Sequence, residues 1–396
     1  MRIETFFDTV EVHREDKIIF AKLLEPHMVI STCRCAGGIQ KDMEYVINHQ
    51  SCEPKDHHRG LPIREPEKYR RMICEPHGLP ATKCVTMGTA ANMHHAAFTR
   101  EGFRELEVGA IVTGGVETNA GRAGDPASVY ETEDGFQRLD PPFKTTAPVA
   151  GTINIMLFIN RPLTEAALVR TIMMATEAKT AALQELSVNS RYSDGLATGT
   201  GTDQIVVAAP DREGYRLGWA GKHGKLGELI GLSVIRGVKE TLAKQNCLTP
   251  QGQCSVKILL ERFGCTRSSM TEGIAGYMKG SLAQVLRNNL GGVIRDPVVV
   301  AAVSGMVHIR DRFSWGILPV SCWQEIMGAA AAQVACAIGG RYDRMEEYRE
   351  RLGNSATETD NDSFLHLCWK SMAAGFSDKW PDPPDSEGER CQARDT

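Results

Sequence analysis

The sequence predicts an α/β layered N-terminal domain, in which a mixed sheet is covered by helices, followed by a mainly helical C-terminal region. Up to about residue 245, short apolar runs bounded by glycine-bearing turns alternate with helical patterns, which is typical of a layered α/β domain. Beyond that point helical patterns dominate. We therefore expect an α/β domain at 1–245, a helical region at 246–380, and a disordered tail at 381–396, where charged residues and prolines leave little apolar surface to bury.

Strands are expected where apolar runs are short. The run at 153–159 is nearly continuous in apolar residues, which indicates a central strand covered on both faces. The remaining expected strands lie at 17–24, 27–31, 107–113 and 204–208.

Helices are expected where apolar residues recur at helical spacing. Thr164 can cap a long helix that ends near Leu186, and a second helix is expected at 227–244. The helices expected in the C-terminal region lie at 281–290, 298–311, 322–338, 342–352 and 363–375.

Composition narrows the class of protein. A net charge of -4 over 396 residues gives no electrostatic reason to expect nucleic acid as a partner. No run reaches the roughly 18–20 apolar residues that cross a bilayer, and no secretory signal is recognisable, so we expect a cytoplasmic protein without a membrane partner. The 12 cysteines are spread along a long chain, which favours reduced thiols, with Cys336 in the core.

The strongest chemical feature is the run Ala197-Thr-Gly-Thr-Gly-Thr-Asp203, directly before an apolar strand. Two glycines allow the backbone to approach a ligand, while three hydroxyls and a carboxylate converge there. The alternative is an ordinary turn, because threonine, glycine and aspartate are all common in turns. The candidate site residues in this run are Thr198, Gly199, Thr200, Gly201, Thr202 and Asp203.

A second feature lies in the long helix. Glu177 and Lys179 are two positions apart, so they point to different faces, and one of them is a candidate for facing inward. A charged side chain on an apolar helix face needs an interaction partner or a functional role. For a lone lysine, the competing interpretation is a side chain that reaches solvent along its stem, and this is the one we expect.

Two side-chain amides follow glycines near strand ends. Asn119 lies in a glycine-rich loop that does not match the dinucleotide-binding fingerprint, and Asn154 begins the central strand. Either amide can contact a polar ligand, although such amides are more often structural.

A loop before a helix start carries Lys222 and His223. It lacks the Ser or Thr that completes a phosphate-binding loop. His223 is a candidate acid or base because histidine as a residue type ordinarily titrates near neutrality. The alternative is a surface histidine without a chemical role.

Metal binding has little support in the sequence. Cys33 and Cys35 have no second pair at zinc-finger spacing, and the neighbours His57 and His58 tend to diverge. We expect no metal and no required cofactor.

Taken together in their order, these motifs resemble the adenosylcobinamide amidohydrolase family. The motifs are Ser31-Thr32 with Gly37-Gly38, the run 112–120, Gly151-Thr-Ile-Asn154, the run 176–183, Thr198-Gly-Thr-Gly-Thr-Asp203 and Gly221-Lys-His223. The resemblance covers residues 30 to 237, a little over half of the chain.

The resemblance implies hydrolysis of the amide that joins aminopropanol to the corrin ring, with a corrinoid as the small-molecule substrate. Amide hydrolysis needs an activated nucleophile, donors for the oxyanion and an acid for the amine. As hypotheses, Asp203 is the general base or orients Thr200 or Thr202 as nucleophile, and Lys179 positions charge. The remaining assignments are Asn154 and the backbone amides of 198–202 as oxyanion donors, Glu177 or His223 as the acid, and Asn119, Thr198, Gly199, Gly201 and Lys222 as substrate-binding residues.

Two features depart from the family pattern. Cys33 and Cys35 stand where a plainer glycine-rich turn is expected, and the C-terminal helices are additional. The alternatives are an amidohydrolase for a related substrate and a corrinoid or tetrapyrrole carrier that does not hydrolyse its ligand. A third possibility is that the helical region is an oligomerisation or partner module, through which the chain would form a homo-oligomer.

Overall fold

The computed structural model describes residues 1–51, 61–133, 135–139 and 151–380. The chain divides into two compact units, Met1–Pro250 and Gln251–Thr396, and each is described by itself. His57, His58 and the tail expected at 381–396 lie outside the described residues.

The first unit contains two large sheets, which we name sheet A and sheet B. Within sheet A only the neighbours β6 and β7 run parallel, and the other pairs are antiparallel. The order of sheet A is β1 (Arg2–Phe6), β2 (Val10–Glu15), β3 (Ile18–Leu23), β6 (Tyr45–Gln50) and β7 (Cys84–Thr89).

Sheet B has six strands, of which β13 and β15 are the parallel pair at its centre. All seven residues of β13 are buried, which confirms the prediction of a central strand covered on both faces. The order of sheet B is β5 (Gly38–Gln40), β4 (His27–Ser31), β15 (Gln204–Pro210), β13 (Ile153–Ile159), β9 (Leu106–Gly114) and β8 (Ala97–Phe103).

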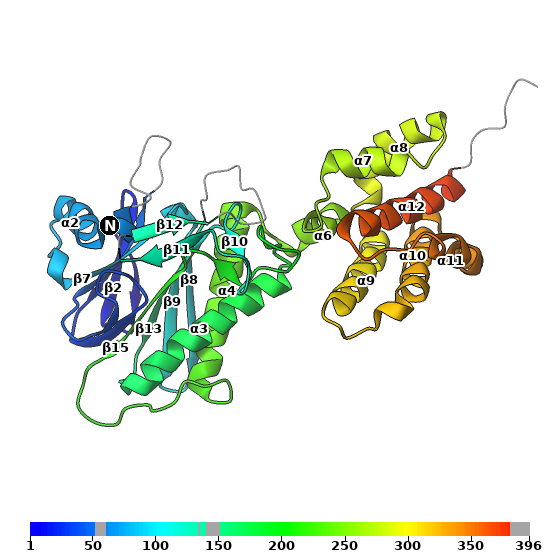
Figure 1. The fold of residues 1–396 in the computed structure, drawn as a ribbon. Coiled ribbons are helices and arrows are strands. Elements are labelled where there is room, and N and C mark those ends of the chain that lie inside the picture. The colour runs from blue at the N-terminus through cyan, green and yellow to red at the C-terminus, as the bar shows by residue number, and fades with distance from the viewer. Residues whose placement is uncertain (52–60, 134, 140–150, 381–396) are drawn as a thin grey trace, which may run out of the picture. The chain divides into compact units, whose positions relative to one another are not determined.

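The two sheets and their helices form four layers. Helices α3 (Glu165–Glu185) and α4 (Lys225–Asn246) cover one face of sheet B, and α2 (Pro66–Cys74) covers the far face of sheet A (Figure 1). The alternation of side chains along β13 fits this order, since Ile155 faces the helices and Met156 faces sheet A. The expected α/β layered domain is confirmed, with two stacked sheets inside it.

Local signals set the ends of α3. The Thr164 hydroxyl accepts a hydrogen bond from the backbone N–H of Ala167 at 3.2 Å, as a helix cap does. The helix then runs to Glu185, one residue from its predicted end.

The second unit is helical, as predicted. The sequence analysis did not expect three helices that precede the five it did, namely α5 (Pro250–Gln253), α6 (Val256–Glu261) and α7 (Arg267–Ala275). Those five are α8 (Gly280–Val293), α9 (Pro297–Ser314), α10 (Trp323–Gly339), α11 (Met345–Gly353) and α12 (Asn361–Lys379).

Helix α10 lies in the centre of the second unit. Gly375 on α12 allows the two helices to approach closely, because a Cβ there would lie 2.2 Å from the backbone oxygen of Ala335. Cys336 is fully buried there, as predicted. No single helix in the described ranges has the length and apolar character to cross a membrane, although α8 and α9, bent by 87°, meet that test as a pair.

Candidate functional site

A buried ion pair lies where α3 meets the start of β15. The Lys179 ammonium contacts Oδ2 of Asp203, and the two side chains are only 8% and 9% exposed. The expectation that Lys179 reaches solvent is therefore wrong. Its charge is compatible with burial because Asp203, 24 residues further along the chain, supplies the opposite charge.

The Asp203 carboxylate has donors on both of its oxygens. Oδ1 accepts the Thr200 hydroxyl at 2.6 Å and the backbone N–H of Ile153 at 2.8 Å. Oδ2 accepts the backbone N–H of Thr200 at 2.9 Å in addition to Lys179. Because a carboxylate offers about four acceptor positions, these donors hold Asp203 in one orientation.

Gly199 allows this pair to form. A Cβ added to Gly199 would lie 2.5 Å from Oδ2 of Asp203 and 2.7 Å from Nζ of Lys179. The loop is held in place by a short antiparallel pairing of β14 (Gly199–Thr200) with β10 (Ala120–Gly121). The glycine at this position therefore brings the backbone against two charged groups.

A second group of hydroxyls adjoins the first. The hydroxyls of Thr202 and Thr152 lie 2.6 Å apart, and Thr202 also donates to the backbone oxygen of Gly151 at 3.1 Å. Thr202 is exposed and Thr200 is half-buried. This hydroxyl cluster, consisting of Thr152, Thr200 and Thr202, lies beside the ion pair and next to solvent.

Asn119 and Thr198 fix the loops around the cluster. The Asn119 amide donates to the Gly151 oxygen at 2.9 Å, and its oxygen accepts the Tyr192 hydroxyl at 3.0 Å. Thr198 accepts the backbone N–H of Ala123 at 2.9 Å. Both side chains thus hold loops together, and Asn119 is buried.

Asn154 lies on the opposite face of sheet B. Its amide nitrogen donates to Oδ1 of Asn48 at 2.8 Å and to the backbone oxygen of Gly88 at 3.1 Å. Both of its amide hydrogens are therefore used between the sheets, and the residue is fully buried. We call Asn48, Thr113, Asn154 and Gln204 the inter-sheet amide cluster, because Asn48 also donates to Thr113 at 2.7 Å and Gln204 accepts the Gly88 N–H at 3.2 Å.

Three other predicted residues lie at the surface. Glu177 forms an ion pair with Lys222, and their side chains are 44% and 63% exposed, so the pair adds little to stability. His223 is exposed as well. The structure thus separates Glu177, Lys222 and His223 from the buried Lys179–Asp203 pair.

Sequence reasoning did not assign roles to several residues that complete the site. Thr152 was visible only as part of a glycine motif, and Tyr192 lies in a loop with no pattern that marks it. Gln204 follows Asp203 directly and belongs to the inter-sheet cluster, so the two residues serve opposite faces of one sheet.

The two cysteines that depart from the family pattern are inert by environment. Burial raises the pKa of Cys33 to about 12, and burial followed by the Glu67 carboxylate raises the pKa of Cys35 to about 12. A nucleophilic cysteine needs a lowered pKa. Among the described residues, no group of three or more His, Cys, Asp or Glu side chains is arranged to hold a metal ion.

The first unit is thus defined as a four-layer α/β domain with a buried Lys–Asp pair beside threonine hydroxyls. Comparison with known proteins is more specific. The family profile described as adenosylcobinamide amidohydrolase matches residues 3–250, nearly the whole first unit. The chain belongs to this family.

Two relatives are informative. An uncharacterized protein of Methanocaldococcus jannaschii is 35% identical over 246 residues, which cover 60% of this chain and 91% of the relative. An adenosylcobinamide amidohydrolase of Methanosarcina mazei is 36% identical over 101 residues, which cover 24% of this chain and 47% of that protein.

Proposed function

We propose that the first unit hydrolyses the aminopropanol amide of adenosylcobinamide and releases adenosylcobyric acid and (R)-1-amino-2-propanol. Family membership supports an amidohydrolase. The observation that carries the proposal is the buried Lys179–Asp203 pair, whose carboxylate holds the Thr200 hydroxyl beside solvent. The corrinoid is the substrate, and the proposal assigns no metal or cofactor.

Thr200 is the proposed nucleophile, with Asp203 as the group that orients it. As Oγ1 of Thr200 attacks the amide carbon, its proton passes along the existing 2.6 Å hydrogen bond to Oδ1 of Asp203. When the carbon–nitrogen bond breaks, the same proton passes to the departing amine. Water then hydrolyses the Thr200 ester and regenerates the hydroxyl.

Lys179 has an electrostatic role in this scheme. Its ammonium contacts the other oxygen of Asp203, so it balances the charge of the carboxylate and sets its orientation. Within the run 198–202, the backbone amides of Thr198 and Thr200 already donate to the Gly121 oxygen and to Asp203. The amides of Gly199 and Gly201 are therefore the proposed donors to the oxyanion. Asn154 is not used as a donor in this scheme, because both of its amide hydrogens are engaged between the sheets.

The acid for the amine was expected to be Glu177 or His223. Both are exposed, and Glu177 is engaged with Lys222. In the proposed scheme the proton taken from Thr200 serves instead, so neither residue is required for turnover.

The test is incubation of the full chain with adenosylcobinamide, followed by mass spectrometry for the corrinoid acid and the amine. Stoichiometric release of both products supports the proposal. The alternative, a corrinoid carrier, predicts a change in the visible spectrum of the bound corrinoid without release of the amine. That outcome would replace the hydrolase proposal.

A further inference from the structure

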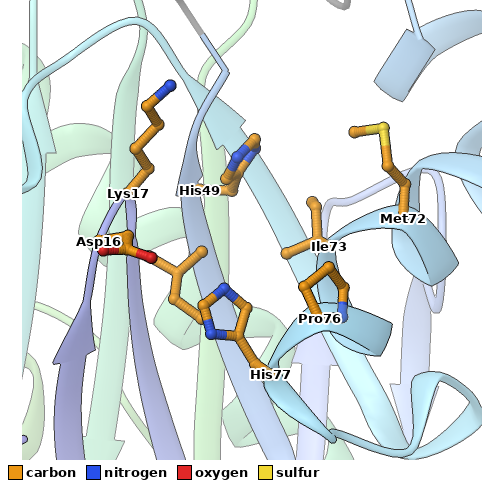
Figure 2. A pocket seen from close by; sticks show the side chains of 8 residues that line it. Asp16, Lys17, His49, Met72, Ile73, Pro76 and His77 are labelled. Carbon is orange, nitrogen blue, oxygen red and sulfur yellow. The ribbon is translucent and has the colours of Figure 1, made fainter.

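A pocket of about 470 Å³ lies on the outer face of sheet A, away from the Lys179–Asp203 pair. The turn before β3, the end of β6, helix α2 and the 3-10 turn Glu75–His77 form its walls. Figure 2 shows Asp16 and Lys17 on one side and Met72, Ile73 and Pro76 on the other. The lining residues are Asp16, Lys17, Ile18, His49, Met72, Ile73, Pro76 and His77.

The floor of the pocket is apolar. Ile18 and Ile73 are buried, whereas Met72 is half-buried and Pro76 is exposed. An apolar floor favours a flat ring, and methionine makes favourable sulfur contacts with aromatic rings. The size lies in the range of about 300–1,000 Å³ that is usual for small-molecule sites.

The rim of the pocket carries both signs of charge. The Asp16 carboxylate is exposed and makes no hydrogen bond or ion pair with the described part of the chain. Lys17 follows it directly, and Nδ1 of His77 lies 3.0 Å from the Glu15 carboxylate. Because positive and negative groups alternate, the rim favours a neutral ligand with donors and acceptors over a polyanion.

We propose that this pocket binds a purine nucleoside. The base would lie on the Met72 and Pro76 side chains, and the paired ribose hydroxyls would donate to the Asp16 carboxylate. The remaining ring nitrogen of His77, Nε2, is the group that would contact a polar edge of the base.

The inference does not depend on the proposed hydrolysis. The pocket and the Lys179–Asp203 pair lie on opposite outer faces of two stacked sheets, and such sheets are about 10 Å apart. Because of this separation, the adenosyl group of a corrinoid held at the Lys179–Asp203 pair does not reach the pocket, so the proposed ligand is a free nucleoside.

The experiment measures binding of adenosine to the full chain by calorimetry, with Asp16→Asn and His77→Gln as test variants. Asp8→Asn is the matched control, because Asp8 is also an exposed aspartate at a hairpin turn with a positive φ (59°, against 44° for Asp16) and does not line the pocket. Saturable binding that weakens at least tenfold in both test variants and stays unchanged in the control is the expected result.

Two results would overturn the proposal. One is the absence of saturable binding of adenosine, or binding that Asp16→Asn and Asp8→Asn weaken equally. The other is tighter binding of inorganic phosphate than of adenosine. Either leaves the product assay unaffected, so failure here is separate from failure of the proposed hydrolysis.

A second arm checks that the ligand is a free nucleoside. Asp16→Asn should weaken binding of adenosine and leave binding of adenosylcobinamide unchanged. Equal weakening of both would make the pocket part of the corrinoid site and overturn the inference.

Discussion

Gly199 lies directly against Asp203: a methyl group on Gly199 would be 2.5 Å from the carboxylate oxygen Oδ2. No such contact is tolerated between real atoms, so a side chain at this position must displace the carboxylate or the loop. The orientation of Asp203 therefore depends on a residue that carries no functional group.

Replacing Gly199 by alanine is expected to separate Asp203 from Lys179. Overpacking of this kind costs about 1–3 kcal/mol of stability, and turnover of adenosylcobinamide should fall at least tenfold. Gly218→Ala is the control, because a Cβ there has no heavy atom within 4 Å. Thermal unfolding and turnover of both variants check the prediction, which is wrong if the two behave alike.

The contributions of Lys179 and Asp203 to the free energy of unfolding should be strongly coupled. Removing one partner of a buried pair leaves an uncompensated charge and costs about 3–5 kcal/mol. We expect Lys179→Met and Asp203→Asn each to lower the free energy of unfolding by this amount, and the double variant to lose far less than the sum. Denaturant unfolding of the four proteins gives the coupling, and additive losses would contradict the pair.

Asn154→Ala tests whether this residue holds the sheets together or takes part in chemistry. The substitution leaves the Gly88 and Asn48 oxygens without a donor, at about 1–3 kcal/mol each. Turnover of the folded variant should fall less than tenfold. A loss of about 10²–10³-fold would restore the role of oxyanion donor.

Asn160→Ala provides the comparison for Asn154→Ala. Asn160 follows the other end of β13 and bonds the backbone of Glu105 and Glu107. Its loss should lower stability without any effect on turnover.

Stability should fall as the pH drops below 7, in part because of His27. This side chain is buried on β4, and burial lowers its pKa below the usual 6.5. The unfolded chain therefore binds a proton more readily, so the stabilisation is present above pH 6.5 and is lost as the pH falls through the folded-state pKa.

His27→Gln should flatten this part of the stability profile, although it also lowers stability at neutral pH by removing the contact of Nδ1 with the Glu25 backbone oxygen at 2.8 Å. Exposed His94→Gln should leave the profile unchanged. Denaturant midpoints between pH 5 and 8 check both, and equal profiles for the wild type and His27→Gln would refute the assignment.

Sequence patterns predicted the helices and strands that depend only on residues close together in the chain. The Thr164 cap and the apolar spacing after it place α3 within one residue at its C-terminal end, and six apolar residues among the seven at 153–159 identify β13. The pairing of two sheets needs contacts between strands far apart in the chain, which no local pattern contains. Helices α6 and α7 were not predicted because they span only six and nine residues, which is too short for apolar residues to recur over several turns.

The sequence predicted which types of residue form the site, but not which of these residues contact one another. Lys179 appeared to be a solvent-reaching lysine because its counter-charge comes from a loop 24 residues away. Asn154 was grouped with Asp203, yet the two-residue period of a strand places it opposite Ile153, whose N–H bonds Asp203. No sequence pattern marks Tyr192 as part of the site.

The most direct test of the account is turnover of adenosylcobinamide by folded Thr200→Val and Asp203→Asn variants beside the wild type. Thr200→Val keeps the shape of the side chain and removes only the proposed nucleophile. We predict a loss of at least 10³-fold in Thr200→Val with unchanged corrinoid binding, and a comparable loss in Asp203→Asn. Near-wild-type release of aminopropanol by either folded variant would contradict the assignment of the active site to the Lys179–Asp203 pair and its threonine.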